Sequence, residues 1–330
     1  MLAVFAVNLG SIVRQKITLA DRLNNRRQLF LIAEAGALRA FAELRKKDST
    51  LNADALNDSW SSDEGMFKEV PLEQGAYSVE YQYKEDGGEK TRYGLLDEER
   101  KVNLNKADVE VMARLLQMTA GLGSEKSTEL AFAIFDWRDA DSFFQHPEYG
   151  AEDDDYREMR LPFESKDGAF ERTEELLLVK GMTREIFDKI KNFITIYPES
   201  NININTASKE TLLAYGLQEN LADLILSFRK GQDSQEGTTD DQVFYQSADV
   251  VPKLSQAFNL GINDIDALSS FISKANPATT SDNFMVRSLG RLDKNKQELE
   301  IVAVINRKSQ VRYWREEYRK SSHDGAEAEF

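Results

Sequence analysis

Segments with the alternation typical of β-strands occur in two groups, far apart in the sequence. The first group comprises residues 76–83 and 90–96, which flank the glycine turn Glu85-Asp86-Gly87-Gly88 as in a β-hairpin. The second group comprises residues 284–290, 298–306 and 310–314. Because two strands make a poor isolated unit, we expect both groups to share one sheet, with the intervening chain inserted between them.

The block between the two strand groups is nearly all helical. Helical periodicity is found near residues 107–118, 124–136, 172–179, 184–196, 208–214, 219–229 and 262–273. We therefore expect an α+β fold that carries a large all-α insertion.

The first 47 residues form one continuous helical pattern. Met1 to Val13 is almost entirely apolar, and the basic segment that follows has an apolar stripe at helical spacing that includes Phe30, Leu38 and Phe41. Thirteen residues rise about 20 Å, less than the ~30 Å hydrocarbon core of a bilayer. The apolar run is therefore either part of a longer membrane anchor whose start is missing, or a short buried core helix.

Charge and residue types exclude several function classes. The net charge of −15 argues against a general nucleic-acid binder, which needs clustered Lys and Arg. Cysteine is absent and His146 and His323 are the only histidines, which removes thiolate zinc sites and most catalytic triads. P-loop, GxGxxG, GxSxG and HExxH motifs are also absent. We expect no enzymatic activity, no nucleic-acid partner and no small-molecule substrate.

A short motif occurs twice in the helical block. Residues 102–107 (VNLNKA) and 202–207 (ININTA) each precede a helix, a glycine turn and a second helix that ends at Arg138 or Arg229. A third unit, residues 173–183, has the same layout, and all three look like helix-hairpin-helix modules. Asn105 and Asn205 are predicted to cap the helices that follow them. In such modules the hairpin backbone often approaches a DNA phosphate, but the acidic residues after the first hairpin favour a structural role.

Residues 136–158 form a dense acidic loop, with nine carboxylates against two arginines. Carboxylates at this density repel one another unless something compensates them, and hard oxygen ligands from a loop suit Ca²⁺. The spacing is not that of an EF-hand. The alternative is a solvated acidic loop, the usual explanation of a charge run.

Taken in order, these features resemble the minor pseudopilin K family of type II secretion, also called general secretion pathway protein K. The resemblance covers almost the whole chain. The matching stretches are Ala33–Ala37, Leu96–Asn105, Asp136–Asp141, Gly150–Asp154, Glu174–Thr183 and Ile202–Ala207.

The resemblance implies a pilin-like fold, in which a long N-terminal helix packs on an antiparallel sheet that carries the all-α insertion. We expect a stem helix at residues 1–47, a sheet domain at 48–97 and 282–318, an inserted helical domain at 98–281, and a disordered tail at 319–330. It also implies one or two bound calcium ions. The residues that match the acidic motifs of the family are Asp136, Asp139, Asp141, Glu152, Asp153 and Asp154.

The function implied by the resemblance is that of a non-enzymatic tip subunit, which starts the pseudopilus and supports protein export across the outer membrane. Its expected partners are the minor pseudopilins I and J, bound through the stem helix and the sheet, and the inner-membrane assembly platform. Phe30 and Phe41 are the predicted stem contacts. The anchor would lie in the inner membrane, truncated here, and the globular part in the periplasm. The alternatives are a minor pilin of a type IV pilus, adhesion or uptake system, and a cytosolic helix-hairpin-helix DNA-binding protein.

Overall fold

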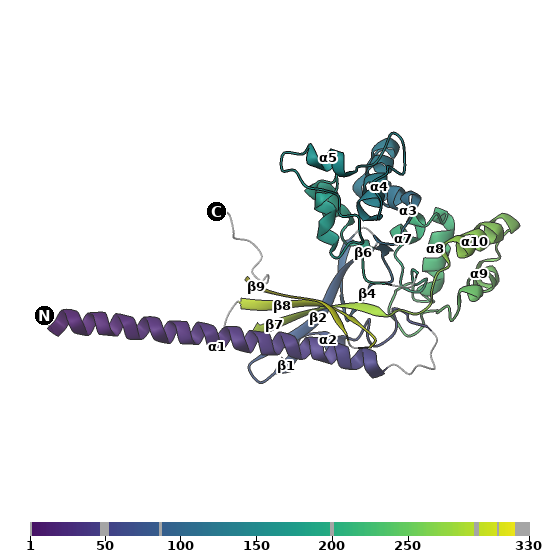
Figure 1. Ribbon diagram of the computed structural model, residues 1–330. Helices are drawn as coiled ribbons and strands as arrows, with labels where there is room; N and C mark the ends of the chain where they lie inside the picture. Colours follow the sequence, from purple (N-terminus) through teal and green to yellow (C-terminus); the bar gives the residue numbers. More distant parts are fainter. Residues whose placement is uncertain are drawn as a thin grey trace. The chain divides into compact units, whose positions relative to one another are not determined.

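The computed structural model describes residues 2–46, 53–85, 88–198, 201–293, 297–308 and 310–320. The chain divides into two compact units, drawn in Figure 1. The sheet unit comprises Met1–Lys47, Ser59–Leu96 and Phe284–Phe330, and the helical unit comprises Asp48–Asp58 and Asp97–Asn283. Most of the predicted tail lies outside the described residues, and its first two residues, 319 and 320, belong to the last strand.

The long N-terminal helix α1 spans Leu2–Lys46 and packs its C-terminal half on the sheet. The buried positions repeat every three or four residues and are mostly small, namely Leu29, Ala33, Ala37, Ala40 and Leu44. Close approach requires Gly290 in the sheet, because a Cβ there would lie 2.7 Å from the Leu29 carbonyl oxygen. In the described part of the chain, no helix combines the length and apolar character that a bilayer crossing requires.

The two sides of α1 differ in what they contact. Phe30 and Phe41 are partly buried against the core of the sheet unit. Leu31 and Leu38, seven residues apart, are 51% and 56% exposed, and Leu19 and Leu23 are also exposed. At 100° per residue, Leu31 and Leu38 lie on the side of the helix opposite to Leu29 and Ala40. An apolar face of α1 therefore points away from the sheet.

The sheet joins both strand groups, as the alternation predicts. Its strands are β1 (Val70–Leu72), β2 (Gly75–Glu85), β3 (Gly88–Tyr93), β4 (Leu96–Asp97), β7 (Asn283–Leu292), β8 (Gln297–Asn306) and β9 (Val311–Lys320), and a short helix α2 (Glu64–Phe67) precedes β1. The order is β1-β2-β7-β8-β9, with β3 paired to β2 and β4 to β7. The antiparallel register that pairs Gly75 with Leu292 connects the two groups directly.

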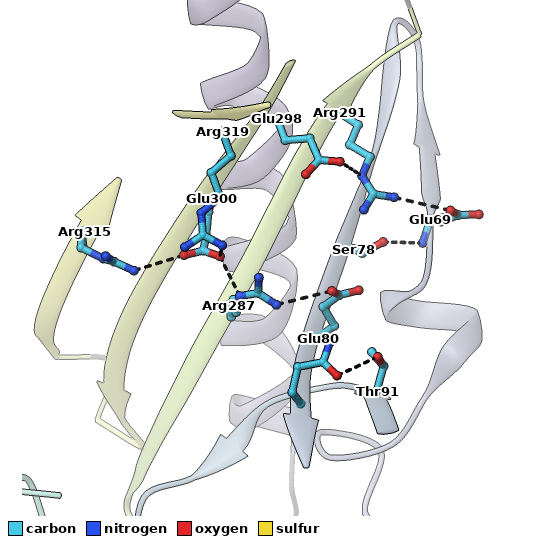
Figure 2. Close-up of polar contacts among 11 residues, drawn as sticks. Glu69, Ser78, Glu80, Thr91, Arg287, Arg291, Glu298, Glu300, Arg315 and Arg319 are labelled. Atoms are coloured by element: carbon cyan, nitrogen blue, oxygen red, sulfur yellow. Dashed lines mark hydrogen bonds and ion pairs between the residues drawn. The ribbon is translucent and has the colours of Figure 1, made fainter. Parts of the chain in front are cut away.

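The two faces of the sheet are built differently. Leu299 and Ile301 of β8 are buried in the core beneath α1. Glu300, between them, points to the opposite face, where its carboxylate pairs with three arginines from the neighbouring strands (Figure 2). The N···O distances are 2.7 Å from Arg287, 3.1 Å from Arg315 and 2.9 Å from Arg319. This ion network satisfies a carboxylate that is only 1% exposed.

The helical unit contains short helices and one small parallel sheet. Its first half has β5 (Val102–Asn103), α3 (Val109–Leu115), the π-helix η1 (Leu116–Ala120), α4 (Ser124–Arg138), α5 (Asp153–Arg157), the 3₁₀-helix η2 (Thr173–Leu178), α6 (Arg184–Ile190) and β6 (Ile194–Thr195). Its second half has α7 (Lys209–Ala214), α8 (Glu219–Arg229), η3 (Ser247–Asp249), α9 (Val250–Phe258) and α10 (Ile262–Ala275). Each half has its own hydrophobic core. The mixed fold with a long N-terminal helix and an antiparallel sheet is thus confirmed.

Candidate cation site

Each copy of the repeated motif closes a loop through one asparagine side chain. Asn105 accepts a hydrogen bond from the Phe170 N–H at 2.7 Å and donates to the Phe170 carbonyl at 3.0 Å. Asn205 makes the same two bonds with Phe244, both at 2.9 Å. The first pair closes residues 139–169 after α4, and the second closes residues 230–243 after α8. The repeat is therefore a device for anchoring a loop.

The predicted capping role of Asn105 and Asn205 is wrong. The side chain of Asp108 caps α3 by accepting from the Val111 N–H at 2.8 Å, and Ser208 caps α7 in the same way. These residues lie three positions after the asparagines, where the backbone is extended just before the helix begins.

The two arginines at the ends of the hairpins are used inside the fold. Arg138 donates to the carbonyls of Leu104 and Ala107, and Arg229 donates to the carbonyl of Ala207 at 2.7 Å. Arg229 also pairs with Glu236 at 2.5 Å and is almost fully buried. These guanidinium groups are therefore engaged internally rather than presented to a phosphate. The assignment of the repeats to the helix-hairpin-helix class stays a prediction.

The first loop brings carboxylates together around the end of α4. Asp136 is fully buried, and its oxygens accept from the N–H groups of Gln145 at 3.3 Å and Ala151 at 3.1 Å. Gly150 is required beside it, because its φ is +112° and a Cβ there would lie 2.0 Å from Asp136 Oδ2. Glu152, two residues further on, is 3% exposed.

The surroundings of this loop disfavour the ionised forms of its carboxyl groups. Burial, followed by the charges of Asp136 and Asp139, raises the pKa of Glu152 to about 7. Burial also raises the pKa of Asp136 to about 6 and shifts the pKa of Asp139 upward. Both carboxylate oxygens of Glu152 and Oδ1 of Asp139 are buried without a hydrogen-bond partner among the described residues. Buried anionic oxygens without a donor fit a bound cation.

Four of the six predicted ligands lie close enough to influence one another. Asp141 is exposed, yet its charge acts on both Asp136 and Glu152. The structure adds Asp167, whose charge acts on Asp139 and Glu152 and whose carboxylate accepts from Ser165 Oγ at 2.6 Å. No local pattern marks Asp167, since it reaches the group only after the loop is closed at Phe170.

The structure does not bring Asp153 and Asp154 into this group. Asp153 accepts from the Ser165 N–H at 3.0 Å and pairs with Arg157 at 2.9 Å. Asp154 pairs with Arg157 at 3.1 Å, and its side chain is 94% exposed. Within the described ranges, no three or more His, Cys, Asp or Glu side chains already surround one point as metal ligands. The carboxylates lie near one another but do not form a complete coordination shell.

The second loop serves as an internal comparison, because it is anchored in the same way. Its acidic side chains are paired or hydrogen-bonded within the protein. Glu236 pairs with Arg229, Asp240 accepts from the N–H groups of Gln232 at 2.6 Å and Asp233 at 3.1 Å, and Asp241 accepts from the Gly237 N–H at 2.7 Å. The carboxylates of an asparagine-anchored loop can thus find their partners within the protein. The buried oxygens of the first loop that have no hydrogen-bond partner therefore differ from those of the second loop.

The comparisons with known proteins agree with this architecture. A family model described as type II secretion system (T2SS), protein K, matches residues 93–199. A search of curated protein sequences gave no match. Among solved structures, the chain is similar to one chain of the crystal structure of the GspK-GspI-GspJ complex from the enterotoxigenic Escherichia coli type 2 secretion system. The TM-score is 0.61 at 17% sequence identity, and the match covers 92% of this chain and 99% of that chain.

The two matches have different weight. At 17% identity the structural likeness establishes the fold, and the family model adds the specific assignment of the first half of the helical unit. That half contains the first anchored loop with its carboxylates. The expectation of a structural subunit rather than an enzyme agrees with both matches. Residues 93–199 thus match the family model of type II secretion system protein K, and the fold of the chain is similar to that of a chain in the GspK-GspI-GspJ complex.

Proposed function

We propose that the chain caps the tip of the pseudopilus, starts fibre assembly with the minor pseudopilins I and J, and thereby supports protein export across the outer membrane. The structurally similar chain was crystallised in a GspK-GspI-GspJ complex, which supports I and J as partners. The helical unit is inserted between strands of the sheet and comprises more residues than the sheet unit. Such an insertion suits a cap, because it would obstruct subunits added beyond it.

The exposed apolar face of α1 is the proposed contact with I and J. Leu31 and Leu38 lie on this face, in the half of the helix that packs on the sheet. Phe30 and Phe41 are less suitable, because they already contact the core of the sheet unit. In the cell, the N-terminal segment would belong to an inner-membrane anchor next to the assembly platform, with both globular units in the periplasm.

Co-purification with I and J tests the proposed contact. Replacing Leu31 and Leu38 with Asp should remove I and J from the complex while leaving the thermal midpoint of the isolated chain within a few degrees of the wild type. Leu178→Asp, at a 50% exposed leucine of the helical unit, is the matched control and should retain both partners. Retention of I and J by the Leu31→Asp, Leu38→Asp chain would contradict the proposal.

We also propose that the first acidic loop binds Ca²⁺. Glu152 and Asp139 would supply carboxylate oxygens directly, with Asp136, Asp141 and Asp167 contributing negative charge or further oxygens. Calcium takes six to eight oxygen ligands, so backbone carbonyls of the loop would complete the shell of one or two ions. The bound ion would supply the positive charge that Arg229 supplies to Glu236 in the second loop.

Thermal unfolding in EDTA, in Mg²⁺ and in Ca²⁺ tests this site. An ion that binds only the folded chain raises the midpoint, and the rise should be selective for Ca²⁺. Glu152→Gln should remove most of this rise. Asp154→Asn is the control, because that carboxylate is exposed and pairs with Arg157, and it should leave the rise intact. Loss of the rise in Asp154→Asn but not in Glu152→Gln would overturn the assignment.

A further inference from the structure

The stretch of α1 that precedes the sheet is not covered by the described part of the chain. Residues 11–24 are exposed on every side of the helix, and in Figure 1 this half of α1 projects beyond the strands of the sheet unit. Its exposed apolar side chains include Ile12, Ile17, Leu19 and Leu23, each at least 50% exposed. A helix of this length is only marginally stable in water by itself, so we expect this stretch to meet a further surface.

The same stretch has a concentration of positive charge. Five basic residues lie between positions 14 and 27, and Asp21 is the only acidic residue among them. The chain as a whole has a net charge of −15, so its balance of charge is reversed here. The surface that meets this stretch is therefore expected to be negatively charged.

Four of the five basic side chains are not used by the fold. Arg26 is the exception, because its guanidinium carbon lies over the Tyr318 ring of β9, 4.2 Å from the ring centre. Within the described ranges the other four are exposed and form no ion pair, and we name them the basic collar: Arg14, Lys16, Arg22 and Arg27. Their charge is available to a partner.

The position of the collar on the helix favours a membrane surface. It directly follows the apolar run that ends at Val13, which the proposed anchor places in the hydrocarbon core. At 1.5 Å per residue, Arg14 and Lys16 lie within about 5 Å of the end of this run, and Arg22 and Arg27 lie about 14 and 21 Å from it. The polar layer outside the hydrocarbon core is roughly 5–8 Å thick on each side. Arg14 and Lys16 therefore lie at the depth of the headgroups.

We propose that the basic collar binds the headgroups of an anionic phospholipid bilayer. Lipid phosphate oxygens accept hydrogen bonds from Arg14 and Lys16, whereas Arg22 and Arg27 act through longer-range attraction. The inference rests on the proposed membrane anchor and adds an electrostatic contact to its apolar one. This contact would retain the subunit at the membrane until its stem joins the fibre.

The size of the effect follows from the number of charges near the surface. Each Lys or Arg close to an anionic bilayer strengthens binding about fivefold, and the attraction decays within a Debye length of about 10 Å at 0.1 M salt. Arg14 and Lys16 together should thus give roughly 20-fold tighter binding to an anionic bilayer than to a neutral one. Arg22 and Arg27 should add less, and high salt should reduce the whole preference.

Flotation of the full chain with lipid vesicles tests the proposal. Vesicles of phosphatidylcholine measure binding through the apolar run, and vesicles that also contain phosphatidylglycerol measure what the collar adds. The wild type should prefer the anionic vesicles about 20-fold. Replacing all four collar residues with Gln should remove this preference and leave binding to phosphatidylcholine unchanged. Arg14→Gln with Lys16→Gln should remove more of it than Arg22→Gln with Arg27→Gln.

A charge-matched variant is the control. It replaces four exposed basic residues outside the stem with Gln, which changes the net charge by the same amount and should keep the full preference. These residues are Lys126, Arg160, Lys274 and Arg312. Because every substituted side chain is exposed, both variants should unfold at the same temperature as the wild type.

Three outcomes would overturn the proposal. They are equal binding of the wild type to both kinds of vesicle, an undiminished preference in the collar variant, and an equal loss of preference in the control variant. If the collar variant binds lipid normally but no longer co-purifies with I and J, the collar binds an acidic protein surface and the lipid assignment is wrong. Binding of the wild type to anionic vesicles alone would support the collar and contradict the membrane anchor, so the two proposals can fail separately.

Discussion

Replacing each of the two loop-anchoring asparagines with Ala should have unequal effects on folding stability. Asn205 is 2% exposed, so Asn205→Ala leaves the N–H and the carbonyl of Phe244 buried and without their partner. An unsatisfied buried polar group costs roughly 1–3 kcal/mol, which gives a loss of about 3 kcal/mol for the two groups. Asn105 is only partly buried, so water can replace some of its bonds to Phe170, and Asn105→Ala should lose about 1–2 kcal/mol.

The same two variants should differ in the opposite order in their response to calcium. Asn105 closes the loop that carries Glu152 and Asp139, so Asn105→Ala should shift the calcium midpoint to higher concentration. Asn205→Ala should not. Urea unfolding in EDTA measures the stability change, and a calcium titration followed by thermal midpoint measures the binding change. The reasoning is refuted if the stability losses are equal or reversed in order, or if Asn205→Ala weakens the calcium response as much as Asn105→Ala does.

Three further predictions concern the ion network and the acidic loop. Glu300→Gln removes the charge that three arginines share and should reduce stability in urea by about 2 kcal/mol, and an unchanged midpoint would contradict the role of the network. Gly150→Ala forces a Cβ against Asp136 Oδ2 at a positive φ, so it should lower both the thermal midpoint and the calcium response, and normal values would count against this close approach. In EDTA the midpoint should fall between about pH 4 and 7, because the raised pKa values of Asp136 and Glu152, about 6 and about 7, mean that stability present at low pH is lost as these groups ionise. Saturating Ca²⁺ should remove that fall, and a midpoint that rises with pH in EDTA would contradict the assignment.

The sequence pattern was sufficient for the main elements of the fold and less so for their boundaries. The alternation of apolar and polar residues in the two strand groups predicted their common sheet. A strand with this alternation buries one face, and two strands alone make a poor isolated unit. Helix α9 was not anticipated, since Pro252 interrupts the apolar pattern, although a proline in the first turn of a helix is tolerated. The predicted helix at 184–196 ends at Ile190, and the β-branched residues after it form β6.

The composition of the acidic loop could be predicted from the sequence, but the direction of each side chain could not. Density alone does not distinguish Glu152, which points inward, from Asp154, which lies on α5 and faces Arg157. Asp167 joins the group only because Asn105 anchors Phe170, a contact between residues 65 positions apart. The roles of the asparagines were missed for a similar reason, since a capping residue and a loop anchor differ by only three positions in the same motif.

The most direct test of the account is sedimentation velocity of this chain mixed with the I and J pseudopilins of its own secretion system. The account predicts a single species that contains one copy of each of the three proteins, and predicts that Leu31→Asp with Leu38→Asp returns this chain to its own sedimentation boundary. If the wild-type chain sediments separately from I and J at concentrations where I and J associate with each other, its assignment as the tip subunit would be contradicted.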